Sequence, residues 1–383
     1  MAKPPLRVVQ VLPELNAGGV ERGTVEFAQF LVAQGHQSTV ISAGGRLVPE
    51  LTAQGSEHIA FPVHRKSLAS LFKVRSLRRL LMQLAPDIVH VRSRVPAWMV
   101  WLALRGMPHA QRPALVSTFH GLYSINAYSA IMGCGDAVIA ISECVREYIL
   151  NNYPKVDPAK ISLVHRGVDT DQFNTQCRPS TDWLAQFDRE FPGLRQRPVL
   201  LMPGRLSRWK GQLEFIDLMA QLRAQNIAAT GLIVGDITPG KDDYLGELKA
   251  KVAALGLDEQ VKFLGHRSDM AQLYAISTLV CNLSQRPEPF GRTVIEAMAM
   301  GTPVVAYNVG GPAESLALAL PQGLVATGDG QALLAKVAEF IASPPVPKQV
   351  PEFTLQTQAQ KTLAIYQRLL VQTGNLNSTG GTE

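Results

Sequence analysis

Two glutamates eight residues apart, Glu288 and Glu296, enclose the stretch of this sequence whose residue types are best suited to chemistry. Between them the chain passes through Gly291 into a pattern of helical spacing, so we expect a loop that leads into a helix with Glu296 in its first turn. A helix start binds phosphate through unsatisfied N–H groups and the positive end of the helix dipole. Carboxylates accept hydrogen bonds from paired hydroxyl groups. The stretch therefore predicts a site for a sugar attached to phosphate, with Glu288 as an exposed acid.

A basic loop, Gly204–Gly211, follows a predicted strand further upstream and contains Arg205 and Lys210. Breaking a sugar–diphosphate bond leaves negative charge on the diphosphate, and fixed cations directed at that charge lower the barrier. A basic loop by itself is usually only solvated. Its place upstream of the Glu288 stretch favours a role in the same site.

The first half of the chain holds a glycine-rich turn and a histidine at strand ends. Gly18 and Gly19 lie between the first predicted strand and the first predicted helix, and their spacing is not Gly-x-Gly-x-x-Gly. That departure counts against a dinucleotide cofactor and hence against a dehydrogenase. His120 ends another predicted strand, where α/β sheets bind ligands. The alternatives are a simple tight turn and a structural histidine.

The stretch Glu288–Glu296, with the following Ala-Met-Ala-Met-Gly-Thr-Pro-Val-Val-Ala, resembles the E-x7-E signature of the family 4 glycosyltransferases. The loop Gly204–Gly211 resembles the Gly-Arg…Lys-Gly element of that family. Gly265–Asp269 resembles its element beside the nucleobase. The resemblance implies an α/β fold of the GT-B type, with two Rossmann-like doubly wound domains facing a cleft.

The resemblance also implies a role for each matching residue. Glu288 would bind the donor sugar, Glu296 the ribose hydroxyls, and the backbone around His266 the edge of the nucleobase. Gly18 and Gly19 lie where the family has its glycine-rich acceptor-side loop. The implied catalytic residues are Glu288, Arg205, Lys210 and His120. The implied donor-binding residues are Gly18, Gly19, Gly235, His266, Phe290, Gly291, Arg292, Thr293 and Glu296.

Asp169-Thr-Asp171 matches the Asp-x-Asp pattern that binds divalent metal in the other large glycosyltransferase fold. Here it lies in a segment that resembles the Asn-Gly-Val-Asp…Phe sequence leading to the interdomain linker of family 4. His165 and Arg166 stand where that family commonly has Pro-Asn. Since cations and a helix start are available for the diphosphate, we expect no metal ion and no cofactor besides the nucleotide sugar.

The elements that hold these residues are predicted to form two α/β units, because 383 residues exceed a typical domain of about 150. Apolar runs separated by helix-length intervals predict parallel sheets. The predicted strands are 6–12, 37–42, 88–91, 114–118, 137–141 and 161–164, then 199–202, 229–234, 261–264, 279–283 and 303–306. We expect an acceptor-side domain at 1–180 and a donor-binding domain at 181–350. Residues 351–383 are expected to form a helix that returns to the first domain, followed by a mobile tail.

Composition fits an ordinary globular enzyme, with 46% hydrophobic and 18% charged residues. No apolar run is long enough for a signal peptide or a membrane span. The four cysteines, Cys134, Cys144, Cys177 and Cys281, are too far apart for a Cys-x-x-Cys motif. A cytoplasmic protein with reduced thiols is expected.

Positive charge is concentrated in the first half. Residues 58–135 contain ten Lys and Arg and one acid, a net +9 against +6 for the whole chain, so the rest sums to −3. The segment 65–82 mixes cations, among them Lys73, Arg75, Arg78 and Arg79, with leucines and Phe72. It suits an anionic membrane surface on the inner face of the cytoplasmic membrane. The alternative is an amphipathic helix with a solvated basic face, and we expect no nucleic acid partner.

The resulting hypothesis is a retaining glycosyltransferase that moves a hexose or heptose from a nucleotide-diphosphate sugar to a lipid-linked or lipopolysaccharide-type acceptor. A sugar-nucleotide 2-epimerase is one alternative, although its acid and base residues are not found in the sequence. A non-catalytic sugar-nucleotide-binding protein is another. An epimerase would change the donor sugar without an acceptor, and donor turnover would exclude a binding protein.

Overall fold

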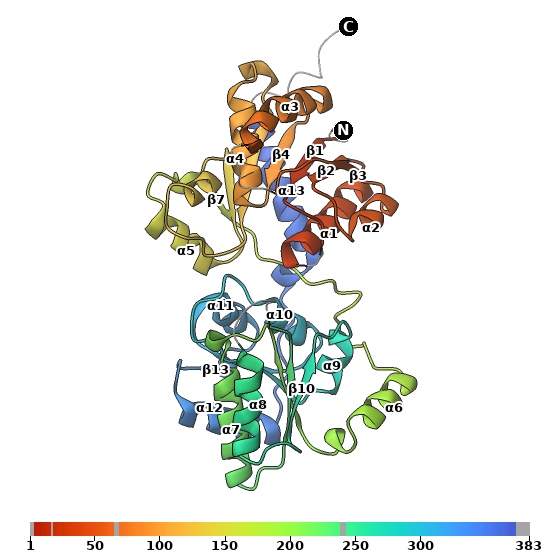
Figure 1. The fold of residues 1–383 in the computed structure, drawn as a ribbon, viewed down its shortest axis with the longest axis vertical. Helices are drawn as coiled ribbons and strands as arrows, with labels where there is room; N and C mark the ends of the chain where they lie inside the picture. The colour runs from red at the N-terminus through yellow and green to blue at the C-terminus, as the bar shows by residue number, and fades with distance from the viewer. Residues whose placement is uncertain (1–3, 17, 65–68, 238–242, 373–383) are drawn as a thin grey trace. The chain divides into compact units, whose positions relative to one another are not determined.

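The computed structural model describes residues 4–16, 18–64, 69–237 and 243–372. The chain divides into two compact units (Figure 1). The first unit consists of Met1–His165 together with Leu355–Glu383, and the second of Arg166–Thr354. Both units are α/β, which confirms the predicted fold class.

The boundaries between the units differ from the expected residues 180 and 350. The first unit ends at His165, and the chain returns to it at Leu355. Val168 belongs to the second unit, because its N–H donates to Phe353 O at 2.8 Å and it forms a parallel bridge with Thr354. The two crossing segments thus pair with each other. Hydrophobic periodicity does not reveal such pairing, which explains the displaced boundaries.

The first unit contains a parallel sheet of seven strands in the order β3-β2-β1-β4-β5-β6-β7. Its strands are β1 (Arg7–Val11), β2 (Gln37–Ser42), β3 (Glu57–Ala60), β4 (Ile88–Val91), β5 (Ala114–Phe119), β6 (Ala137–Ala140) and β7 (Ile161–Leu163). Its helices are α1 (Gly19–Ala33), α2 (Val48–Ala53), α3 (Ala69–Leu84), α4 (Arg94–Arg105), α5 (Glu143–Asn152) and α13 (Leu355–Gln372). Strands β4, β5 and β6 are buried along their whole length, as expected for a parallel sheet with both faces covered.

Helix α13 packs in the core of the first unit, beside α1 (Figure 1). Its apolar face joins the cluster that contains Phe27. The hydroxyl of Tyr366 lies 2.6 Å from His90 Nδ1, and Thr118 Oγ1 lies 2.7 Å from His90 Nε2. Burial, with the charge of Arg92 as a second cause, holds the pKa of His90 well below its usual value. The imidazole is therefore a neutral link between α13 and the sheet.

The second unit contains a parallel sheet of six strands in the order β10-β9-β8-β11-β12-β13. Its strands are β8 (Val199–Pro203), β9 (Thr230–Val234), β10 (Val261–Gly265), β11 (Leu279–Asn282), β12 (Val304–Tyr307) and β13 (Leu324–Val325). Its helices are α6 (Thr181–Glu190), α7 (Gln212–Ala224), α8 (Tyr244–Ala254), α9 (Met270–Ile276), α10 (Arg292–Ala299), α11 (Gly310–Ala319) and α12 (Gly330–Ala342).

Two edge strands, β3 and β13, are absent from the prediction. Strand β3 has no buried residue, and β13 is two residues long. Both pair on only one side, β3 with β2 and β13 with β12. Since an edge strand needs neither length nor a continuous apolar run, its sequence carries little strand signal.

Each sheet has a point at which the direction of strand order reverses. In the first unit it lies between β1 and β4, and in the second unit between β8 and β11. Ligands of open α/β sheets bind outside the carboxyl ends of the strands at this switch point. In the second unit, β8 leads into the loop 204–211 and β11 into the loop 283–291. The fold therefore brings together the two loops that contain Arg205, Lys210 and Glu288.

Candidate active site

Lys210 and Glu288 meet at the switch point of the second unit. Lys210 Nζ lies 2.5 Å from Glu288 Oε2. The other carboxylate oxygen accepts a hydrogen bond from Ser284 Oγ and a longer one, 3.3 Å, from Asn282 Nδ2. Glu288 is only 7% exposed, so the expectation of an exposed acid is wrong. The carboxylate is held by three side chains, those of Lys210, Ser284 and Asn282.

The two loops also join through their backbones. Gly211 has a φ of +85°, and a Cβ at this position would lie 2.2 Å from Leu283 O, so only glycine fits. Gln285 N–H donates to Trp209 O at 2.8 Å. These contacts fix the loop after β8 against the end of β11, which sets the position of Lys210 relative to Glu288.

Glu296 lies in the second turn of α10, because the helix begins at Arg292, and not in the first turn as expected. It is 9% exposed. The hydroxyl of Tyr274 donates to Glu296 Oε2 at 3.0 Å, and Arg292 Nε lies 3.4 Å from Glu296 Oε1 without hydrogen-bond geometry. Burial and, second, the charge of Glu296 raise the pKa of Tyr274 well above its usual value. The phenol therefore stays protonated and can donate to the carboxylate.

The starts of α10 and α11 lie against the Glu288 segment. Gly291, the N-cap of α10, has a φ of +89°, and no side chain caps the helix. Gly311 N–H donates to Glu288 O at 2.8 Å, and a Cβ on Gly310 would lie 2.6 Å from Glu288 N. A helix start without a side-chain cap offers its backbone N–H groups to an anion. The uncapped start of α10 thus fits the predicted phosphate site.

A cavity of about 300 Å³ lies at the carboxyl ends of β8, β9 and β10. The loops around it are tied by their backbones, since Gly204 N–H donates to Val234 O and Gly235 N–H to Gly265 O, both at 2.8 Å. Four of the predicted residues line this cavity: Arg205, Gly235, His266 and Thr293. Its other lining residues are Pro203, Gly204, Val234, Asp236, Arg267 and Met270. The structure thus places four widely separated candidates at one site.

Phe290 has a packing role. Its side chain is buried, and its ring meets the edge of Phe353 at 6.2 Å between centroids. The side chain therefore belongs to the core of the second unit, and only the backbone of Phe290 remains for contacts with a donor.

Three further candidates, Gly18, Gly19 and His120, belong to the first unit. Gly18 is the N-cap of α1, and Gly19 is its first residue. His120 follows β5 and borders a small pocket together with Thr118 and Arg92. Burial lowers the pKa of Arg92 to about 10. The two glycines thus lie at the start of α1 and His120 at the end of β5, as expected from the sequence.

The Asp-x-Asp pair has a local structural role. Asp169 Oδ1 accepts a hydrogen bond from Asp171 N–H at 2.9 Å, which closes a turn. Within the described ranges, no three His, Cys, Asp or Glu side chains gather in a way that could hold a metal ion.

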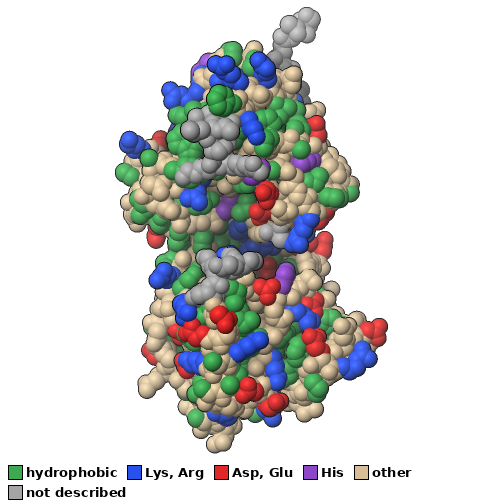
Figure 2. Space-filling model, in the orientation of Figure 1, with side chains coloured by type: hydrophobic (Ala, Val, Ile, Leu, Met, Phe, Trp, Pro, Cys, Tyr) green, Lys and Arg blue, Asp and Glu red, His purple; other side chains and the backbone are tan. Residues whose placement is uncertain are grey.

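Helix α3 contains residues 69–82 of the basic segment, and residues 65–68 lie outside the described residues. Phe72 is 84% exposed, next to Lys73, and Arg75 and Arg79 are exposed as well. Figure 2 shows Lys and Arg side chains around hydrophobic ones at this end of the first unit. Arg78 differs from the other three, because its Nε donates to Ala103 O at 3.0 Å and so fastens α3 to α4. In the part of the chain that the structure describes, no helix is long and apolar enough to cross a membrane.

Sequence reasoning did not identify three side chains that contact Glu288 or Glu296: Asn282, Ser284 and Tyr274. Asn282 and Ser284 lie at the end of a predicted buried strand, just before Glu288, and this position was a usable signal. Tyr274 gave no such signal, because it lies on a different helix from Glu296 and is brought to it only by packing.

Two family models match the chain. The model described as Glycosyltransferase Family 4 matches residues 17–172, and the model described as Glycosyl transferases group 1 matches residues 185–355. Together with the two doubly wound sheets, these matches define the class of protein. The chain belongs to the group 1, family 4 glycosyltransferases, which confirms the resemblance seen in the Glu288–Glu296 stretch.

Individual relatives agree with this assignment. The lipopolysaccharide core biosynthesis mannosyltransferase LpcC of Rhizobium leguminosarum bv. viciae is 31% identical over 244 residues, or 61% of this chain and 65% of that relative. A glycosyltransferase from Rickettsia africae ESF-5 has a similar structure, with 29% identity, a TM-score of 0.80 and coverage of 98% and 100% of the two chains. HepE of Anabaena, solved in complex with UDP, shares the fold with 24% identity, a TM-score of 0.74 and coverage of 96% and 100%. The fold is that of the GT-B glycosyltransferases.

Proposed function

We propose that the protein transfers a sugar from a nucleotide-diphosphate donor, held by the second unit, to a hydroxyl group of an acceptor. The observation that carries this proposal is the Lys210–Glu288 pair at the switch point between β8 and β11. It combines a buried carboxylate for sugar hydroxyls with a cation for the diphosphate, at the place where α/β sheets bind nucleotides.

The cavity at the ends of β8, β9 and β10 is proposed to hold the nucleoside. Thr293, from the first turn of α10, borders this cavity, and the uncapped helix start would receive the diphosphate. Arg205 and Lys210 would stabilise the negative charge on the leaving diphosphate. Glu288 would accept hydrogen bonds from the donor sugar, and Glu296, oriented by Tyr274, from the ribose.

The proposed transfer retains the configuration at the anomeric carbon and needs no metal ion. The bond between the anomeric carbon and the diphosphate oxygen breaks, and a bond from the acceptor oxygen to the anomeric carbon forms on the same face. The acceptor proton passes to the departing diphosphate oxygen. A trapped covalent glycosyl-enzyme, or activity lost in EDTA and restored by Mg²⁺, would contradict this mechanism.

The donor sugar is proposed to be a hexose or heptose and the acceptor a lipid-linked or lipopolysaccharide-type molecule. The name of the relative LpcC, a mannosyltransferase of lipopolysaccharide core biosynthesis, supports a hexose and this class of acceptor. HepE was solved with UDP, which makes UDP-sugars the first donors to test. GDP- and ADP-sugars complete the set.

Thermal unfolding in the presence of UDP-, GDP- and ADP-sugars tests the donor. A ligand that binds only the native state stabilises it by about 2.7 kcal/mol at one hundred times its Kd. We expect the nucleotide sugars of one base to raise the Tm of the protein. We also expect that donor to be consumed when a saccharide acceptor is supplied. No stabilisation by any of these donors would overturn the proposal. Conversion of the sugar without an acceptor would instead identify an epimerase.

We also propose that α3 attaches the protein to an anionic membrane surface. Exposed Phe72, with Lys73 beside it and exposed Arg75 and Arg79 on the same helix, is the pattern of an interfacial helix, in which apolar groups enter the head-group region and cations face anionic lipid. The proposed attachment is to the inner face of the cytoplasmic membrane, where a lipid-linked acceptor would be available.

Replacing Lys73, Arg75 and Arg79 by Ser should weaken binding to phosphatidylserine-containing vesicles about 100-fold at low salt, since each cation contributes about 1 kcal/mol. Arg78 is left in place because it fastens α3 to α4. The control replaces Arg189, Arg197 and Lys249 of the second unit, which removes the same charge. Equal losses in the two variants, measured by vesicle sedimentation, would refute a specific role for α3.

A further inference from the structure

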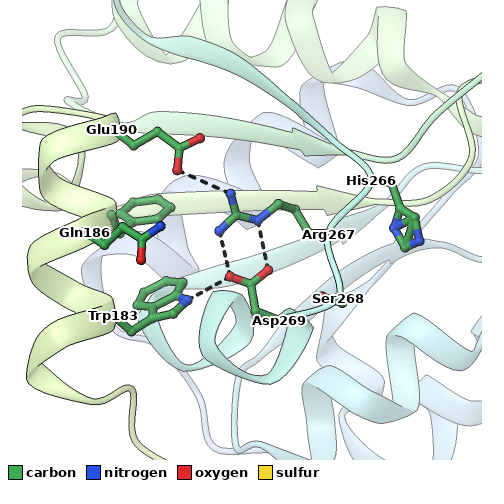
Figure 3. A pocket seen from close by; sticks show the side chains of 8 residues that line it. Trp183, Gln186, Glu190, His266, Arg267, Ser268 and Asp269 are labelled. Carbon is green, nitrogen blue, oxygen red and sulfur yellow. Dashed lines mark hydrogen bonds and ion pairs between the residues drawn. The ribbon is translucent and has the colours of Figure 1, made fainter.

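The loop His266–Asp269 separates two cavities of the second unit. On one side lies the cavity of about 300 Å³ at the carboxyl ends of β8, β9 and β10, called the donor-side cavity below. On the other side lies a cavity of about 400 Å³ between the loop and α6. His266 and Arg267 border both. In Figure 3 the side chain of His266 lies apart from the others, which gather between α6 and the loop. The loop is therefore a thin wall between the two cavities. Contacts that fix its outer side, beside α6, also fix its inner side, which borders the donor-side cavity.

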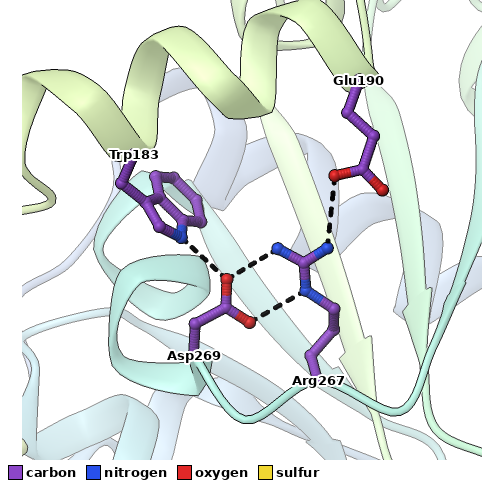
Figure 4. Close-up of polar contacts among 4 residues, drawn as sticks. All are labelled: Trp183, Glu190, Arg267 and Asp269. Atoms are coloured by element: carbon purple, nitrogen blue, oxygen red, sulfur yellow. Dashed lines mark hydrogen bonds and ion pairs between the residues drawn. The ribbon is translucent and has the colours of Figure 1, made fainter.

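Four side chains on the outer side form one connected network (Figure 4). Arg267 donates to both oxygens of Asp269, through Nε at 2.9 Å and Nη2 at 2.6 Å. Trp183 Nε1 donates to the same carboxylate at 2.7 Å. Glu190 Oε2 lies 3.5 Å from Arg267 Nη1. Two residues of α6 thus hold a pair of residues in the loop.

Asp269 takes part in this network and does not cap the helix that follows it. It is the N-cap of α9, yet its side chain makes no capping hydrogen bond. Aspartate at an N-cap normally accepts from backbone N–H groups of the first helical turn. Here both carboxylate oxygens are directed to Arg267 and Trp183 instead. The side chain is therefore engaged in holding the loop, and not in starting the helix.

The α6 side of the network is itself rigid. The ring of Trp183 stacks on Phe187, with 5.0 Å between centroids and 15° between planes. Ser180 caps α6 by accepting from Trp183 N–H at 3.2 Å. The Arg267 hydrogen bonds lower the pKa of Asp269 and raise that of Arg267, so the pair stays charged. A stacked indole N–H and a bidentate ion pair leave little freedom of position.

The inner side of the wall is anchored at the strand end. Gly265 has a φ of +63°, and its carbonyl accepts from Gly235 N–H at 2.8 Å. The loop is thus fixed at Gly265 by the neighbouring strand end and at Asp269 by α6. His266 and Arg267 lie between these two anchors.

We propose that Trp183 and Asp269 are positioning residues that set the wall of the nucleobase pocket, and so the selectivity of the enzyme for the base of its donor. This inference rests on the proposed function, because it takes the donor-side cavity as the nucleoside site. Trp183 and Asp269 act through the loop and touch no reacting atom. Their loss changes recognition of the base and leaves the transfer step intact.

The test compares W183F and D269N with the native enzyme. W183F keeps a ring on Phe187 and removes the indole N–H, and D269N weakens the bidentate pair. We expect the Kd for the preferred nucleoside diphosphate, among UDP, GDP and ADP, to rise about 3- to 10-fold, the size expected for the loss of one ordinary hydrogen bond. The preference over the other two bases narrows, the KM for the donor rises in parallel, and kcat changes less than twofold.

The matched control is D188N. Asp188 also lies on α6 and also forms a bidentate ion pair, but its partner Arg195 lies outside the loop. D188N should leave both Kd and base preference unchanged. If all three variants behave alike, or if W183F and D269N keep the native base preference, the inference is overturned while the proposed function stands. If the native protein binds none of the three nucleotides, the proposed function fails and the inference with it.

Discussion

E288Q is expected to reduce kcat by about two to three orders of magnitude, the size of effect seen when one group that stabilises a transition state is removed. Gln keeps the shape of Glu and an oxygen that can accept from Ser284. Its amide, however, presents N–H groups to Lys210, which is itself only a donor. The sugar hydroxyls would lose a charged acceptor, and the cation beside the diphosphate would move.

The burial of Glu288 adds a second expected effect. Because the carboxylate lies in a nearly closed environment and pairs with Lys210, E288Q should lower the free energy of unfolding by about 1–3 kcal/mol. Activity must therefore be measured well below the Tm of the variant. E259Q is the control, since Glu259 is almost fully exposed and its replacement removes the same negative charge. Native turnover in folded E288Q would refute the assigned role.

K210M should lower kcat by about 100-fold or more, because it removes the cation proposed to face the charge developing on the diphosphate. It should also destabilise the protein by about 3 kcal/mol, since Glu288 stays buried without its partner. The matched control is K336M, because Lys336 pairs with Glu339 on the surface, and surface pairs contribute about 0–1 kcal/mol.

The double variant K210M/E288Q separates the two effects. The stability losses should be less than additive by about 1–3 kcal/mol, because the two residues contact each other. Activity should not recover, since neither the diphosphate nor the sugar regains its partner. Additive stability losses by chemical denaturation would show that the pair contributes nothing through its contact. Recovery of turnover would show that each residue merely neutralises the other.

The fold was largely predictable because interior strands of parallel sheets are continuous apolar runs. The apolar runs of β5 and β8 could be recognised as strands without knowledge of the strands they pair with. Strands β3 and β13 were not, because an edge strand takes its structure from the strand it joins. The domain boundary was missed for a related reason, since the pairing of Val168 with Thr354 depends on residues far apart in the chain.

Residues close together in the chain were sufficient to indicate the family and to suggest several residues of the proposed donor site. Glu288, Gly291 and Glu296 lie on one loop and one helix, so their spacing carries the chemistry locally. Tertiary structure alone decided which partners these groups have. The strand order makes β8 and β11 neighbours, which brings Lys210 to Glu288, and helix packing brings Tyr274 to Glu296. Burial of Glu288 is tolerated because Lys210 supplies a compensating charge from a distant loop, and local spacing does not encode that partner.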